Sequence, residues 1–228
     1  MQFNTYTWAG AYIAVWLVNH PSPDPSALAQ ILHDHDVHEP TATTAEARAL
    51  RPWAQQLRDI FEAGTVTGKA RLADRLLVAS RCHPRLISHG PGLPFHLHYA
   101  PIRAGLIPRV KALTAAGLAH AIDDGAGSRL RACARAGCGS VFIDTSRNGR
   151  RHYCTVRCAN LVNVANHRRR RRQAAGPLTS SGPAGQPALA GLEPASFRGD
   201  AERVHPVASL TTAAVHAEPR ARPAAAGR

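Results

Sequence analysis

The spacing of hydrophobic residues in the first half of the chain predicts helices. Residues 44–64 give the clearest pattern, because apolar side chains recur every three or four positions and therefore share one face of a helix. Polar and charged residues occupy the other positions. The apolar positions are Ala47, Leu50, Ala54, Leu57, Ile60 and Phe61.

Weaker patterns fill the rest of the first 125 residues. Apolar residues spaced by three or four positions predict helices over residues 26–32, 68–80 and 109–123. Side chains that alternate between two faces predict a strand over residues 95–99. The apolar run 8–18 predicts a buried helix or strand, because about eleven residues cannot cross a bilayer that needs about twenty. We therefore expect a mainly helical domain with a minor strand component, and no membrane association.

A different pattern follows between residues 129 and 173. Val141–Ile143 is typical of a short strand, Ser146–Gly149 contains the Asn-Gly turn signal, and Arg151–Cys154 is predicted to be the returning strand. A helix is expected to begin at Cys154 and to continue through Val162 and Ala165. The sequence thus predicts a β-hairpin followed by a helix, and an α+β fold for the chain.

Four of the five cysteines lie in this segment, at Cys133, Cys138, Cys154 and Cys158. Two close thiol pairs on either side of a hairpin can converge on one ion, and tetrahedral Zn(II) takes four thiolates. Two disulfides or four unconnected thiols are the alternatives. No export signal precedes the segment, so we expect a cytoplasmic, reducing environment in which paired cysteines bind metal more often than they form disulfides. We predict one structural Zn(II) and, since four thiolates leave no position for a water nucleophile, no enzyme.

The positive charge of the chain is concentrated around these cysteines. The formal net charge is +13, and residues 126–173 carry 12 Lys/Arg against 1 Asp/Glu. Residues 1–125 carry 11 against 10, and residues 174–228 carry 5 against 4. The segment that contains the four cysteines therefore holds nearly all of the excess positive charge.

Two groups of residues in this segment are candidates for nucleic-acid contacts. One lies at or beside the predicted hairpin tip and the other lies in the helix, and guanidinium groups match phosphate oxygens and the guanine edge. Arginines on all sides of a helix suit phosphate contacts, whereas the tip suits base reading. The alternative is a solvated basic surface that binds nothing specific. The candidates are Arg147, Asn148, Arg150, Arg151, Arg168, Arg169, Arg170, Arg171 and Arg172.

These motifs resemble a known family. The Cys-x4-Cys pair, the phrase from Phe142 to Arg151, and the Cys-x3-Cys pair before a basic helix are similar to the CGNR zinc finger, a treble-clef-like unit. In that family the finger follows an N-terminal ABATE domain in bacterial proteins described as stress-induced transcription regulators, and Leu17-Val18-Asn19 resembles the opening phrase of that domain. One departure is plain, because Ala159 and Leu161 stand where the family has glycine and arginine.

The resemblance implies a zinc-dependent DNA-binding transcription regulator in three parts. Residues 1–125 would be an ABATE-like sensing or partner-binding domain with a small-molecule or protein effector, and residues 129–173 the finger with its basic helix. Residues 174–228 are rich in Ala, Pro and Gly, which predicts a disordered tail. The alternatives are an RNA-binding protein, or a receptor or enzyme domain that the finger locates.

Overall fold

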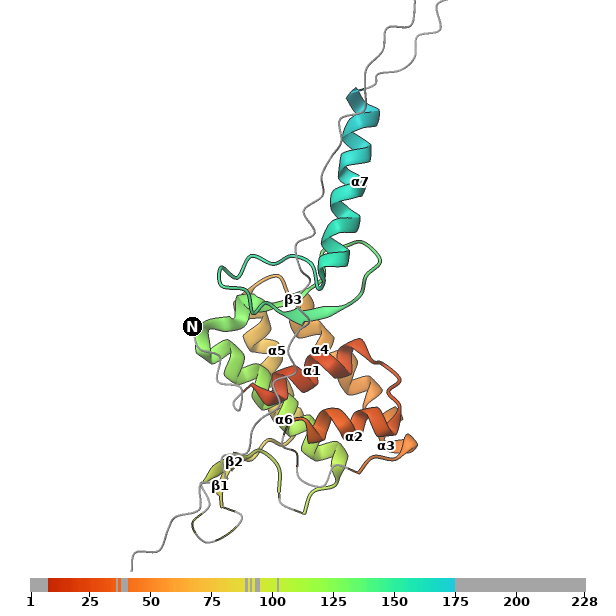
Figure 1. Ribbon diagram of the computed structural model, residues 1–228. Helices are drawn as coiled ribbons and strands as arrows, with labels where there is room; N and C mark the ends of the chain where they lie inside the picture. Colours follow the sequence, from red (N-terminus) through yellow and green to blue (C-terminus); the bar gives the residue numbers. More distant parts are fainter. Residues whose placement is uncertain are drawn as a thin grey trace, which may run out of the picture. The chain divides into compact units, whose positions relative to one another are not determined.

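The computed structural model describes residues 8–35, 37, 41–88, 90, 92, 95–101 and 103–174 (Figure 1). The predicted tail lies outside the described residues, apart from Ala174. One π-helical turn, Ile122–Ala126, and one 3-10 turn, Gly127–Arg129, connect α6 to β3. The other elements are α1 (Ala9–Asn19), α2 (Pro25–His33), α3 (Thr44–Ala49), α4 (Arg51–Glu62), α5 (Val66–Ala79), β1 (Arg85–Ile87), β2 (His96–His98), α6 (Leu106–Ala121), β3 (Leu130–Ala132), β4 (Val141–Ile143) and α7 (Val156–Ala174).

The predicted α+β class is confirmed. Helices dominate the described residues, and the four strands form two separate antiparallel hairpins, β1 with β2 and β3 with β4. In the second hairpin Leu130 lies opposite Ile143, and Ala132 lies opposite Val141. Figure 1 shows the two hairpins at opposite ends of the helical unit.

One predicted helix is divided in two. The spacing over residues 44–64 predicts a continuous helix, but α3 ends at Ala49 and α4 begins at Arg51. The physical reason is Pro52, which has no backbone N–H to donate within a helix and is tolerated only in a first turn, where α4 places it. The apolar stripe survives the break, because Leu50, Leu57 and Ile60 are all buried.

Helices α1 and α6 approach each other closely. Gly10 and Gly117 face each other there, and a Cβ built on Gly117 would lie 2.4 Å from the Ala11 nitrogen and 2.6 Å from the Gly10 Cα. Two helices can approach this closely only where both lack side chains at the crossing. Ile13, Leu17 and Leu118 are fully buried on the same two helices.

The β3–β4 hairpin packs on these helices and completes their core. Leu130, Val141 and Ile143 belong to the same buried cluster as the side chains of α1 and α4. The described residues also lie in one compact unit. The division of the chain at residue 125 stays a prediction.

Two polar side chains of the helical part fix the position of β4 and the loop before it. The Asn19 side-chain amide donates to the Val141 carbonyl at 2.9 Å, and its oxygen accepts from the Val141 N–H at 2.9 Å. Arg58 donates to the Gly139 carbonyl at 2.6 Å and to the Val18 carbonyl at 3.1 Å. The Asn19 side chain therefore occupies the place of a neighbouring strand at the free edge of β4.

The glycine contact predicts a measurable decrease in stability. Gly117→Ala adds a methyl group against the backbone of α1, so we expect unfolding to become easier by about 1–3 kcal/mol. The measurement is denaturant unfolding of the zinc-loaded protein. Gly68→Ala is the matched control, because the nearest atom to its added Cβ is a side-chain oxygen, Thr65 Oγ1, at 3.1 Å. Equal effects at the two positions would contradict the close helix contact.

Candidate metal centre

The first thiol pair lies in the turn that joins β3 to β4. Cys133 directly follows β3, and its N–H donates to the Ser140 carbonyl at 2.8 Å. The Cys138 N–H donates to the Arg135 carbonyl at 3.0 Å, which closes a tight turn. Gly137 and Gly139 have φ of +74° and +69°, values that favour glycine, so the backbone curls around the position that the sulfurs face.

The second thiol pair lies at the start of α7. The sequence predicts that the helix begins at Cys154, but it begins at Val156, because Thr155 caps it: the Cys158 N–H donates to Thr155 Oγ1 at 3.2 Å. Cys154 therefore precedes the helix, while Cys158 lies in its first turn and is buried. The offset still brings their sulfur atoms to 3.6 Å.

The four sulfur atoms form a compact cluster. Cys138 Sγ lies 3.6 Å from Cys154 Sγ and 3.7 Å from Cys158 Sγ, and all four sulfurs lie within 4.8 Å of one another. Four thiolates at about 2.3 Å from a tetrahedral Zn(II) would be spaced by about 3.8 Å. The cluster therefore fits one structural zinc ion, as predicted. Within the part of the chain that the structure describes, it is the only group of three or more potential ligands.

The surroundings of the thiols favour their charged forms unequally. Hydrogen bonding, first of all to the Ser140 side chain, lowers the pKa of Cys138 to about 6. Hydrogen bonds from Thr155 and Arg135 lower the pKa of Cys158, and the Arg135 Nε donates to its sulfur at 3.2 Å. Burial raises the pKa of Cys154 to about 12.

The prediction of a returning strand at Arg151–Cys154 is wrong. Residues 151–154 are predicted to pair with Val141–Ile143. In the structure β4 pairs instead with β3, which precedes the turn that carries Cys133 and Cys138. The N–H of Arg151 donates to Asp144 Oδ2 at 2.8 Å instead of entering a ladder, and the His152 carbonyl accepts from Ala134 N–H at 2.9 Å. The predicted turn at Ser146–Gly149 does form, with Gly149 at φ +60°.

Asp144 organises the loop that carries the tip arginines. Its carboxylate is fully buried and accepts from the Ser146 N–H at 2.9 Å, from the Ser146 hydroxyl at 2.5 Å and from Arg151 N–H. Burial alone would raise the pKa of Asp144, but these hydrogen bonds and the charge of Arg131 outweigh it and lower that pKa. The carboxylate thus stays charged and holds both ends of the loop together.

Two arginines of β3 and its approach hold the same loop from the other side. Arg129 donates to the carbonyls of Asp144 at 2.9 Å and Ser146 at 2.6 Å. Arg131 donates to the carbonyls of Gly149 at 2.9 Å and Arg151 at 3.1 Å. These guanidinium groups stabilise the backbone of the loop.

The structure separates the predicted nucleic-acid residues into two kinds. Arg147, Asn148 and Arg150 are exposed on the loop. Arg151 is also exposed, but its guanidinium donates to the Tyr153 and Cys154 carbonyls and lies 5.3 Å from the centre of the Phe142 ring. Its side chain therefore serves the fold of the finger.

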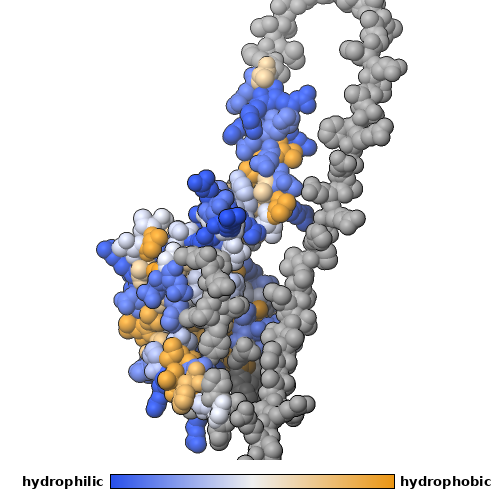
Figure 2. All heavy atoms as spheres, turned by 60° about the vertical axis from the view of Figure 1, so that its left-hand side comes forward, coloured by the Kyte–Doolittle hydropathy of each residue, from blue (hydrophilic) through white to orange (hydrophobic). Residues whose placement is uncertain are grey.

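The arginines of α7 are all exposed. Residues 168–172 follow one another on the helix, and the only residue that α7 buries is Cys158. Figure 2 shows hydrophilic residues along this helix with hydrophobic ones between them. Leu161, which lies on this helix, is 51% exposed. Leu161, which replaces the family arginine, thus points to solvent and leaves the sulfur cluster unaffected.

Three supporting residues carried signals that the sequence analysis did not use. Asp144 begins an Asp-x-Ser motif after a strand. This motif is typical of a turn in which the Asp side chain accepts a hydrogen bond from the backbone two residues later. Arg129 and Arg131 alternate around Leu130, as expected when a strand has one buried face. No local pattern indicates that Asn19 binds a strand 122 residues away.

The sulfur cluster predicts the metal content of cysteine variants. The wild-type protein should contain about one zinc per chain, and Cys133→Ser or Cys154→Ser should lose most of it because each removes one of four ligands. The measurement is elemental analysis of the purified protein. Cys82→Ser is the matched control, since Cys82 lies outside the cluster, and it should keep its zinc. A full zinc content in both cluster variants would contradict the site.

Removing the buried carboxylate should loosen the arginine loop. Asp144→Ala leaves three donor groups without their acceptor, so we expect a loss of about 1–3 kcal/mol in unfolding free energy and faster hydrogen exchange at the Arg151 amide. Because the folded-state pKa of Asp144 is lowered, its contribution is present at neutral pH and is lost as the pH falls through that value. The exposed Asp123→Ala should change neither quantity. Unaltered exchange in Asp144→Ala would show that the carboxylate does not hold the loop.

Comparison with known proteins agrees with this geometry. No curated protein matches the chain significantly. The ABATE-like character of residues 1–125 lies outside the residues that match the family model and stays a prediction. Residues 129–171 match the family model of the CGNR zinc finger, and the predicted resemblance is therefore confirmed for the segment that holds the four metal-binding cysteines.

Proposed function

We propose that the chain is a zinc-dependent nucleic-acid-binding protein, a cytoplasmic bacterial transcription regulator that binds DNA through its finger. One observation carries the proposal. Residues 126–173, which contain the finger, include 12 basic residues and 1 acidic residue, and that acid, Asp144, is fully buried. The accessible charge of the finger is therefore entirely positive, which is the electrostatic requirement for binding a polyanion.

The two exposed basic groups suit different contacts. The arginines at residues 168–172 cover every side of α7, so they suit phosphates, which carry no sequence information. Arg147 and Arg150 lie on a loop that Asp144, Arg129 and Arg131 hold in shape, and their forks suit the guanine edge. Arg151 supports the loop and is left out of the proposed contacts.

The zinc has a structural role in this proposal. The ion would join the β3–β4 turn, which carries Cys133 and Cys138, to the start of α7. Four thiolate ligands fill its coordination, so it would supply no open position for catalysis. No described helix is long and apolar enough to span a bilayer. An RNA-binding role is the alternative, and DNA is favoured because an α-helix fits the major groove of B-DNA but not the narrow one of A-form RNA.

The α7 arginines predict the salt dependence of binding. Replacing residues 168–172 by glutamine should weaken binding to duplex DNA and flatten the plot of log K against log salt by about 0.9 for each phosphate that the variant no longer neutralises. Fluorescence anisotropy with a labelled duplex at several salt concentrations measures this slope. An RNA duplex of the same sequence, titrated in parallel, tests the alternative: tighter binding to RNA would favour the RNA role.

The control variant removes the same number of charges from the helical part. It replaces five exposed arginines by glutamine and should leave the slope unchanged, because the proposed interface is the finger. If both variants flatten the slope equally, the binding is a general charge effect and the proposal fails. The control positions are Arg48, Arg71, Arg75, Arg85 and Arg103.

A further inference from the structure

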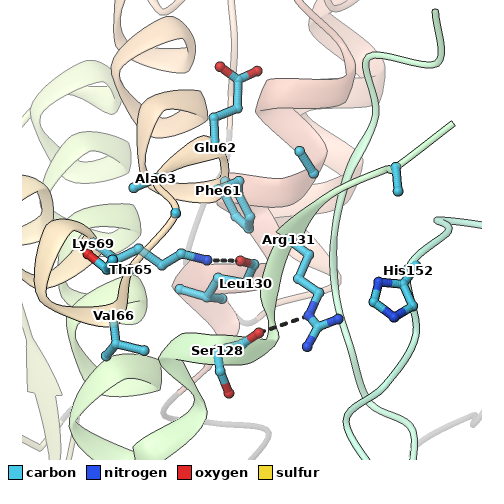
Figure 3. A pocket seen from close by; sticks show the side chains of 13 residues that line it. Phe61, Glu62, Ala63, Thr65, Val66, Lys69, Ser128, Leu130, Arg131 and His152 are labelled. Carbon is cyan, nitrogen blue, oxygen red and sulfur yellow. Dashed lines mark hydrogen bonds between the residues drawn. The ribbon is translucent and has the colours of Figure 1, made fainter. Parts of the chain in front are cut away.

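A cavity of about 490 Å³ lies between the α4–α5 connection and β3 (Figure 3). One side of it is lined by Ala63, Gly64, Thr65 and Val66, and the other by Ser128, Leu130, Arg131 and Ala132. His152, from the loop of the finger, also borders the cavity. The volume is within the range that small-molecule sites occupy.

The cavity contains a buried cation, the ammonium group of Lys69. Lys69 is only 6% exposed, and its ammonium donates to the Leu130 carbonyl, as the dashed line in Figure 3 marks. Among the described residues no carboxylate forms an ion pair with Lys69. A buried charge without a counter-charge is costly, and this burial, followed by the charge of Arg131, lowers the pKa of Lys69.

An arginine, a histidine and the N-terminus of a helix also lie at the cavity. The Arg131 guanidinium lies at the same wall, where it donates to Ser128, and the imidazole of His152 lies beyond it (Figure 3). Thr65 and Val66 form the N-terminal end of α5, a helix of 14 residues whose positive dipole end is therefore at the cavity. Glu62 is the one acid in the lining, and it is half-exposed and pairs with Arg58 at 3.4 Å.

We propose that this cavity binds a small organic anion, with a carboxylate or phosphate group facing Lys69 and a small apolar body. Phe61, Val66 and Leu130 supply the apolar part of the lining. An oxyanion would neutralise the buried ammonium and accept hydrogen bonds from it, and water alone cannot supply the charge. Val66 is 45% exposed, so the site is open to ligand from its rim.

The residues that line the cavity come from two segments of the chain. Lys69 and Val66 come from α5, whereas Arg131 and His152 come from the segment that carries the metal ligands. An anion bound there would contact both, and would stabilise the arrangement in which Lys69 reaches β3. The inference is independent of nucleic-acid binding, because its test measures ligand binding by the protein alone.

The test is calorimetric titration of the full zinc-loaded chain at constant ionic strength. Three anionic probes separate the chemistries: inorganic phosphate, phenyl phosphate and benzoate, with benzyl alcohol as the neutral comparison. We expect saturable binding of an aromatic anion and none of benzyl alcohol. Binding of phenyl phosphate alone would assign a phosphate ligand, and binding of benzoate alone a carboxylate.

Two variants locate the binding. Lys69→Met removes the ammonium but keeps the stem, and Val66→Asp places a negative charge at the rim while leaving the α5 N-terminus with a residue that suits it. Each should weaken anion binding at least about tenfold. The matched controls on the same helix are Arg71→Met and Val78→Asp, both exposed and outside the cavity, and both should bind as the wild type does.

Two outcomes would overturn the proposal. One is the absence of saturable binding for all three anions at millimolar concentration. The other is binding that persists in Val66→Asp, which would place the anion elsewhere, for example on the arginines of α7. Because Val66 is partly exposed, this variant remains informative even if Lys69→Met does not fold.

Discussion

The burial of the β3–β4 hairpin against α1 and α4 is the interaction on which the rest of the finger depends. A hairpin with three residues per strand cannot form a core of its own, and here Leu130, Val141 and Ile143 enter the core of the helices. The Asn19 amide fixes the free edge of β4. Cys133 follows β3 directly, so the position of the first thiol pair is set by packing that involves no metal.

A segment with such a large excess of arginine folds because several of these side chains are used internally. Arg129 and Arg131 donate to carbonyls of the loop. Arg151 donates to the Cys154 carbonyl, and Arg135 donates to the sulfur of Cys158. Each such bond satisfies a backbone or thiolate acceptor that would otherwise need water. The arginines that remain without such a task, on the tip and along α7, are the ones available to a partner.

The sequence predicted what depends on local spacing and missed what depends on distant contacts. Helix periodicity and the number and spacing of the cysteines are local, so the helical part and the metal ligands were both predicted. The partner of β4 was predicted wrongly, because the turn signal at Asn148-Gly149 is genuine but the following N–H goes to Asp144. The contacts of Asn19, Arg58 and Lys69 with the finger join residues more than 60 positions apart, and no periodicity encodes them.

The shared core also has a consequence for the order in which the protein folds during synthesis. The chain leaves the ribosome from its N-terminus, so α1 and α4 emerge well before β3 and β4. Until Val141 and Ile143 follow, the face of these helices that the hairpin covers stays exposed, and Asn19 has no strand to bind. The nascent helical part therefore awaits the zinc-binding segment, and a delay in the synthesis of that segment would lengthen the time for which the apolar face can meet chaperones or aggregate.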